Sequence, residues 1–187
     1  MKSLGIVIAA TAMLGSGCAV FKSDELPLVD AQSYTITNEQ PVKVYSSWTA
    51  GAGGATAAAQ RNYFEAALRS SGCCEIVTDS AQADVVVSGT DAFRMTPGAG
   101  IPAMISGFTF GVIPSWATAG ANLRVGVTSA GNEHRYNVSD SATMVMWLPM
   151  ILAMPFTESP LTVDRSLNEN TYKTLVLRMK NDGLLSR

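Results

Sequence analysis

The alternation of apolar and polar residues predicts three core strands in the first half of the chain. In the segment 41–48 (PVKVYSSW), nearly every second residue is apolar, which is the period of a half-buried strand. Two further apolar runs, at 74–78 and 84–88, predict strands that a short polar turn separates. The run at 84–88 is expected to continue through 92–94.

Two segments have the spacing of amphipathic helices. Between residues 57 and 71, apolar side chains recur on one helical face, and Gly72 is suited to cap the C-terminus. Between 165 and 182 the same spacing recurs, and Gly183 follows it. The apolar positions are Tyr63, Phe64, Ala67 and Leu68 in the first helix and Leu167, Tyr172, Leu175, Val176 and Met179 in the second. We expect both helices to cover one face of a sheet.

A β-hairpin is predicted in the second half of the chain. Residues 122–128 alternate inward apolar side chains, the sequence Ser-Ala-Gly-Asn reverses the chain, and 134–139 return. Strands and helices of this kind predict an α+β fold. We expect a single two-layer domain over 34–187, with an antiparallel or mixed sheet covered by two main helices.

Two long segments without charge interrupt this pattern. Residues 95–123 contain no ionisable side chain, and neither do residues 141–157. A transmembrane helix needs about 20 apolar residues without strong breaks. Both segments fall short of this, because prolines remove helix donors at Pro102, Pro114, Pro149 and Pro155.

Two interpretations of these segments are open. They form strands and crossovers inside the domain, or they form an apolar surface that meets a membrane or a partner. For the second interpretation, the contact regions are 101–118 and 141–157, and the candidate contact residues are Phe108, Phe110, Trp116, Trp147, Ile151 and Phe156. Trp116 and Trp147 lie close to prolines and would suit a lipid headgroup boundary.

The first 17 residues have the pattern of an export signal. Lys2 supplies the positive start, residues 4–14 form an uncharged apolar run, and small residues precede Cys18. This arrangement resembles a bacterial lipoprotein signal, which implies cleavage before Cys18 and fatty acyl chains, palmitate among them, on the new N-terminus. Gly15 stands where such signals usually carry Leu. Ordinary secretory cleavage after Gly17 is therefore the alternative.

The lipoprotein resemblance also implies a destination. Ala19 and Val20 follow Cys18 without the Asp that would retain the protein at the inner membrane. We therefore expect a lipid anchor in the outer membrane of a Gram-negative cell, with the protein facing the periplasm. Residues 18–33 are expected to be an extended, solvated tether.

A wider resemblance covers most of the mature chain. It rests on the lipidation site, the α/β domain, the segment GFTFGVIPSW at 107–116, the hairpin, and the segment WLPMILAMPF at 147–156. Together these resemble small outer-membrane lipoproteins of Gram-negative bacteria. The resemblance supplies no catalytic residues and no cofactor.

Composition narrows the possible partners. Charged residues make up 15% of the chain, below the roughly 25% of typical domains, and the net charge is −2. Without a basic patch, nucleic-acid binding is not expected. Cys73 and Cys74 cannot form a four-ligand zinc site alone. Three interpretations are open for them: buried thiols at a helix-to-strand junction, a vicinal disulfide, or an intermolecular disulfide.

Catalytic chemistry has little support in the sequence. His134 is the one histidine, and we expect it to be a solvated residue near a turn. The glycine-rich loop at 49–56 matches neither nucleotide-binding fingerprint and is expected to be a plain connection. No spacing singles out a carboxylate pair among Asp79, Asp84, Asp91, Asp140 and Asp164.

The sequence thus predicts a non-enzymatic, lipid-anchored envelope protein without cofactor or metal, an assembly or accessory component. Its expected partners are the membrane, reached through the acyl chains, and an envelope protein or a second copy of the chain. A periplasmic carrier that shelters an apolar ligand such as lipid is the alternative.

Overall fold

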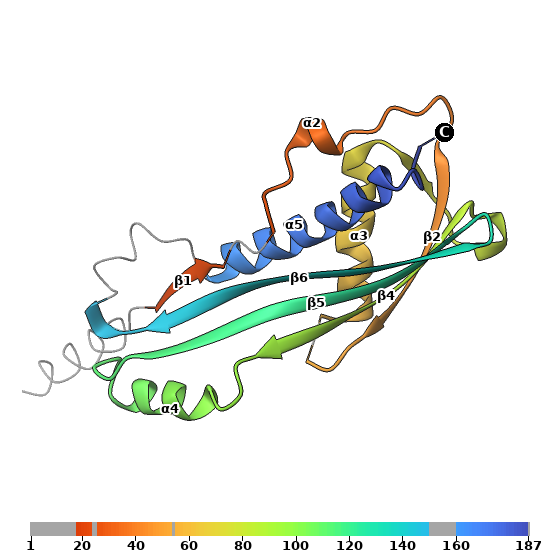
Figure 1. Ribbon diagram of the computed structural model, residues 1–187. Helices are drawn as coiled ribbons and strands as arrows, with labels where there is room; N and C mark the ends of the chain where they lie inside the picture. Colours follow the sequence, from red (N-terminus) through yellow and green to blue (C-terminus); the bar gives the residue numbers. More distant parts are fainter. Residues whose placement is uncertain (1–17, 24–25, 54, 150–159, 187) are drawn as a thin grey trace, which may run out of the picture. The chain divides into compact units, whose positions relative to one another are not determined.

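A computed structural model describes residues 18–23, 26–53, 55–149 and 160–186 (Figure 1). The predicted signal peptide, 1–17, lies outside the described residues. The fold is α+β with a mixed sheet, as the sequence predicted. The sheet has six strands.

The strands are β1 (Cys18–Lys22), β2 (Val42–Ala50), β3 (Cys74–Ile76), β4 (Val85–Met95), β5 (Ser115–Ser129) and β6 (Asn132–Met146). The helices are α2 (Ala31–Tyr34), α3 (Ala57–Ser71), α4 (Gly100–Phe108) and α5 (Pro160–Asn181), with a 3₁₀ turn η1 (Ser80–Gln82). The strand order is β1-β6-β5-β4-β2-β3. β2 is parallel to β3 and β4, and β1 is antiparallel to β6.

The chain divides into two compact units. Unit 1 comprises residues 1–23, 95–119 and 141–165. Unit 2 comprises residues 24–94, 120–140 and 166–187. β5 and β6 each contribute residues to both units, whereas α3 lies in unit 2 and α4 lies in unit 1.

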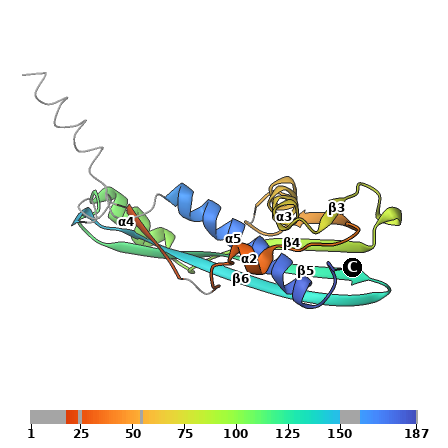
Figure 2. The ribbon, with the colours of Figure 1, turned by 90° about the horizontal axis from the view of Figure 1, so that it is seen from above.

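Unit 2 is organised around a hydrophobic core. Alternate residues of β2 and β4 are buried, as the period of two predicted, and α3 and the unit 2 part of α5 lie over the same face of these strands (Figure 2). The Trp48 ring packs against Phe64 of α3 at 5.3 Å between centroids and against Tyr172 of α5 at 5.5 Å. These aromatic contacts join both helices to the sheet.

The ends of α3 follow from local chemistry. The hydroxyl of Thr56 accepts a hydrogen bond from the Ala59 N–H at 3.2 Å and caps the N-terminus. Gly72 has a φ of 74° and caps the C-terminus in the left-handed conformation. Both bounds of this helix and its glycine cap were predicted from the sequence and are confirmed.

The hairpin of β5 and β6 is longer than the predicted one. It was expected at 122–128 and 134–139, but its strands extend to 115 and 146. Most of the added residues, 115–121 and 141–146, lie in the two uncharged segments, where the contrast between polar and apolar positions is weak, so the sequence carried little signal of period two. The hydroxyls of Thr118 and Thr143 lie 2.8 Å apart within this extension.

The segment that begins at Cys18 also differs from the expected tether. Residues 18–22 form β1, which pairs with β6, instead of an extended linker. Further along, Leu26 is buried in the core of unit 2, and the Val29 N–H donates to the Asn170 side chain at 3.0 Å. Polar linker residues alternate here with apolar ones that find partners, so composition alone predicted the wrong structure.

Candidate functional site

The largest exposed hydrophobic side chains gather in unit 1. The most exposed is Phe108, at 80%, followed by Ile101 at 68% and Trp116 at 66%. We define the apolar surface as Ile101, Met104, Ile105, Phe108, Phe110, Val112, Ile113, Trp116, Trp147 and Leu148, all exposed. A monomer rarely exposes many large apolar side chains so close together in one region, so this surface is the leading candidate site.

Helix α4 turns its large side chains outward. Ile101, Met104, Ile105 and Phe108 recur at the spacing of a single helical face, and all four are exposed. The residue that α4 buries is small and polar: Ser106 is fully buried, and its hydroxyl donates to the carbonyl of Met146 at 3.4 Å. α4 therefore has the reverse of the usual arrangement, in which the large apolar face is turned toward the core.

A tight turn follows α4, and it is hydrogen-bonded to Leu148, which lies just beyond the end of β6. The Gly111 N–H donates to the Ser106 carbonyl at 2.7 Å, and the Gly111 carbonyl accepts from the Leu148 N–H at 2.7 Å. A Cβ on Gly111 would lie 3.1 Å from the Leu148 nitrogen, and its φ of 78° favours glycine. The preceding residue, Phe110, also has a positive φ, of 51°, which is uncommon for a residue other than glycine, and its side chain is exposed.

The predicted acylation site lies on the strand that pairs with this end of β6. Cys18 is the register partner of Met146, which is followed directly by Trp147. Met146 also accepts the hydrogen bond from Ser106 of α4. Cys18 is therefore connected through Met146 both to Trp147, the next residue of the chain, and to helix α4, which is hydrogen-bonded to Met146.

Four of the six contact residues predicted from the sequence lie on this surface: Phe108, Phe110, Trp116 and Trp147. Ile151 and Phe156 lie outside the described residues. The structure adds Ile101, Met104, Ile105, Val112 and Ile113, which the sequence analysis did not single out. For the three residues of α4 the signal was the helical spacing within 101–108, which is short and lies in a segment where nearly every residue is apolar.

Other classes of site have limited support. No helix in the described part of the chain is both long and apolar enough to cross a bilayer. Among those same residues, no group of three or more His, Cys, Asp or Glu side chains could hold a metal ion. His134 lies on β6, half-buried, near the hairpin turn.

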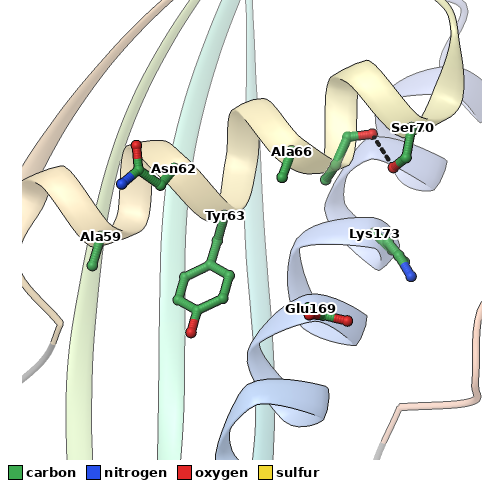
Figure 3. Close-up of a pocket in the computed structure, with 8 residues that line it drawn as sticks. Ala59, Asn62, Tyr63, Ala66, Ser70, Glu169 and Lys173 are labelled. Carbon is green, nitrogen blue, oxygen red and sulfur yellow. Dashed lines mark hydrogen bonds between the residues drawn. The ribbon is translucent and has the colours of Figure 1, made fainter.

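Unit 2 has an open groove between α3 and α5 (Figure 3). Its volume is about 550 Å³, and its lining residues are Ala59, Asn62, Tyr63, Ala66, Ala67, Ser70, Glu169 and Lys173. Glu169 and Lys173 bring opposite charges from α5, while Asn62 adds an amide from α3. A carrier of an apolar ligand needs an enclosed apolar cavity instead, so this groove gives the carrier interpretation little support.

A buried polar cluster in unit 2 fixes the glycine-rich loop. Asp91 is 5% exposed, and burial raises the pKa of its carboxyl, while the N–H groups of Ala55 and Asn122 lower it. The fully buried Gln60 amide donates to the Ala55 carbonyl at 2.8 Å. A Cβ on Gly51 would lie 2.1 Å from the Asp91 carbonyl oxygen, so the loop passes where only glycine fits. These contacts support a structural role for the glycine-rich loop, which the sequence predicted to be a plain connection.

The adjacent cysteines form a disulfide between Cys73 and Cys74, which is the vicinal alternative. Cys73 is fully buried, at the junction between the Gly72 cap of α3 and β3. The bond lies within unit 2.

Comparisons with known proteins give a distant structural similarity. No protein-family model matches the chain, and no curated protein matches it. Among solved structures, the chain is similar to the dodecamer of a PelC point variant from Paraburkholderia phytofirmans. The identity is 12% and the TM-score 0.38, with 91% of this chain and 99% of that chain covered. This similarity is too low to relate the two proteins in function.

Proposed function

We propose that this protein is a non-enzymatic, lipid-anchored component of the bacterial envelope. Cys18 carries the acyl anchor in the outer membrane, and the protein faces the periplasm. It acts as an assembly or accessory component whose apolar surface in unit 1 contacts a membrane or a partner.

The observation that carries this proposal is the exposure of the apolar surface. Moving one large apolar side chain out of water contributes about 1.5–3 kcal/mol, so ten such side chains favour a buried contact strongly. The segments that bear them contain no ionisable side chain between 95 and 123. A region of this composition is poorly suited to water and well suited to an apolar surrounding.

The position of Cys18 supports the anchored part of the proposal. β1 begins at Cys18 and is held in register against β6, so acyl chains on this residue would begin at a defined place in unit 1. Each buried methylene of an acyl chain contributes about 0.8 kcal/mol, and two or more chains together anchor a protein stably.

The test is mass spectrometry of the full-length gene product extracted from its own membranes in mild detergent. We expect a chain that begins at Cys18 and carries the added mass of its acyl chains. A mature chain without that mass would contradict the anchored function.

A second measurement tests the role of the surface. In a Cys18→Ser chain, which carries no acyl anchor, Phe108→Asp is expected to weaken association with the envelope fraction while leaving the urea midpoint of the domain unchanged, because Phe108 is 80% exposed. A Phe108→Asp chain that unfolds would show that this side chain belongs to a core instead.

A further inference from the structure

We propose that the apolar surface enters the same lipid leaflet that holds the acyl chains of Cys18, with α4 lying in the plane of the membrane. This inference rests on the proposed function and names the occupant of its surface: a bilayer, not a protein. It also predicts that insertion does not depend on the charge of the lipid.

The exposed face of α4 suits a membrane interface. Its four large apolar side chains, Ile101, Met104, Ile105 and Phe108, form one exposed stripe along nine residues of helix. A helix that lies in a membrane interface buries one apolar face about 5–10 Å into the boundary between headgroups and acyl chains. The stripe of α4 has this form, and its opposite side is fixed to the end of β6 through buried Ser106.

The strand that begins at the anchor residue pairs with the strand end to which α4 is hydrogen-bonded. Cys18 pairs with Met146, and the Met146 carbonyl accepts the Ser106 hydroxyl of α4. An acylated Cys18 therefore places the bilayer beside α4 and beside Trp147. Anchor and stripe would act on one leaflet together, so their contributions to membrane affinity add.

The apolar surface offers few groups that could form hydrogen bonds with a partner. Protein interfaces carry about one hydrogen bond per 100–200 Å² and have a polar rim around their apolar core. Here the ten side chains offer two polar groups, the indole N–H of Trp116 and that of Trp147. Indoles are enriched at the headgroup level of membranes, where the ring is apolar and the N–H meets polar groups. A lipid leaflet matches this set better than a protein surface does.

The absence of charge sharpens the proposal. Interfacial helices commonly carry Lys and Arg on their polar face, and these add attraction to anionic lipid. No ionisable side chain lies between 95 and 123. Insertion of this surface is therefore driven by the hydrophobic effect, and it should tolerate both neutral lipid and high salt.

The experiment uses the mature chain, residues 18–187, with Cys18→Ser, exported behind a cleavable secretory signal so that it carries no acyl chain. It is floated with vesicles of neutral phosphatidylcholine and with vesicles that also contain anionic phosphatidylglycerol. We expect binding to both kinds of vesicle within about twofold, unchanged by high salt. Binding to anionic vesicles alone, or release by salt, would overturn the hydrophobic mode.

A matched pair of variants locates the contact. Met104→Asp combined with Phe108→Asp is expected to lower vesicle binding at least about tenfold, since two apolar side chains lose their burial. Leu28→Asp is the control, because Leu28 lies in unit 2 and is 80% exposed, as Phe108 is. Equal loss in both variants would contradict insertion through α4.

Tryptophan quenching provides a readout on the acylated wild type, in which no variant has to fold. Brominated lipids in the vesicles should quench Trp116 and Trp147, whereas Trp48 is 7% exposed in the core of unit 2 and should stay bright. Acylated protein whose exposed tryptophans stay unquenched would overturn the proposal.

The outcomes separate this inference from the proposed function. An unacylated chain that ignores vesicles and forms a defined oligomer would assign the surface to a second copy, which overturns the bilayer as occupant but leaves an anchored envelope protein. A chain found without acyl mass in cells, yet bound to vesicles through α4, would instead contradict the anchor and support the inference.

Discussion

The two units of this protein place hydrophobic side chains in opposite ways. In the described part of the chain, the buried core cluster lies entirely in unit 2, with Trp48, Phe64 and Tyr172 at its centre. Of the large hydrophobic side chains that are exposed, all but Leu28 and Phe93 belong to unit 1. Hydrophobic content therefore does not by itself predict burial, because burial needs an element that covers the side chain.

The difference arises from how the helices of each unit lie against its strands. In unit 2, α3 and α5 cover the buried face of β2 and β4, and polar residues such as Lys43 occupy the other face. In unit 1, α4 turns its small Ser106 toward β6 and its large side chains outward. Unit 2 thus buries its large apolar side chains in a core of its own, while unit 1 leaves most of its large apolar side chains exposed.

The strongest test of this contrast uses two phenylalanines. Phe64→Ala should lower the free energy of unfolding by about 3–5 kcal/mol, because it leaves a cavity in the core of unit 2. Phe108→Ala should change it by no more than about 0.5 kcal/mol, because that ring is 80% exposed. Urea unfolding of the mature chain in detergent measures both. Similar losses in the two variants would erase the distinction between the units.

Two glycines give a second matched pair. A Cβ on Gly89 of β4 would lie 2.2 Å from the Trp48 ring, so Gly89→Ala should cost about 1–3 kcal/mol and shift the emission of Trp48. A Cβ on Gly107 of α4 meets nothing within 4 Å, and alanine favours a helix by up to about 1 kcal/mol over glycine. Gly107→Ala should therefore be neutral or stabilising. A Gly107→Ala chain that is less stable than the wild type would indicate that this side of α4 packs against another part of the protein.

The smallest expected effect concerns pH. Burial raises the pKa of Asp91 in the native state above its usual value, so the native state binds this proton more tightly than the unfolded chain does. The stabilisation this provides is complete below the usual pKa of Asp and is lost as pH rises through the native value. Asp91→Asn, which carries no charge at any pH, should therefore gain stability relative to the wild type as pH rises over this range.

Urea midpoints across acidic and neutral pH measure this difference. A variant Asp91→Asn that loses stability relative to the wild type as pH rises would contradict the raised pKa. Because no ionisable side chain lies between 95 and 119, this stretch of unit 1 contributes no side-chain titration of its own, which sharpens the contrast between the units.

Within unit 2, the sequence by itself determined most of the local structure. The bounds of α3, the Gly72 cap and the buried alternation of β2 follow from short-range patterns, since helix caps and strand periods depend on residues a few positions apart. The same patterns gave the α+β class. The candidate contact residues Phe108, Phe110, Trp116 and Trp147 were found because an uncharged run is visible without any structure.

Only the tertiary structure decided whether that run is covered. A period of two or of 3.6 needs polar residues to mark the outer face, and the segments 95–123 and 141–157 have too few to mark one. The pairing of β1 with β6 and the outward stripe of α4 depend on residues more than 30 positions apart. Exposure is a property of which surfaces meet, and in unit 1 it was set by contacts that no local pattern encodes.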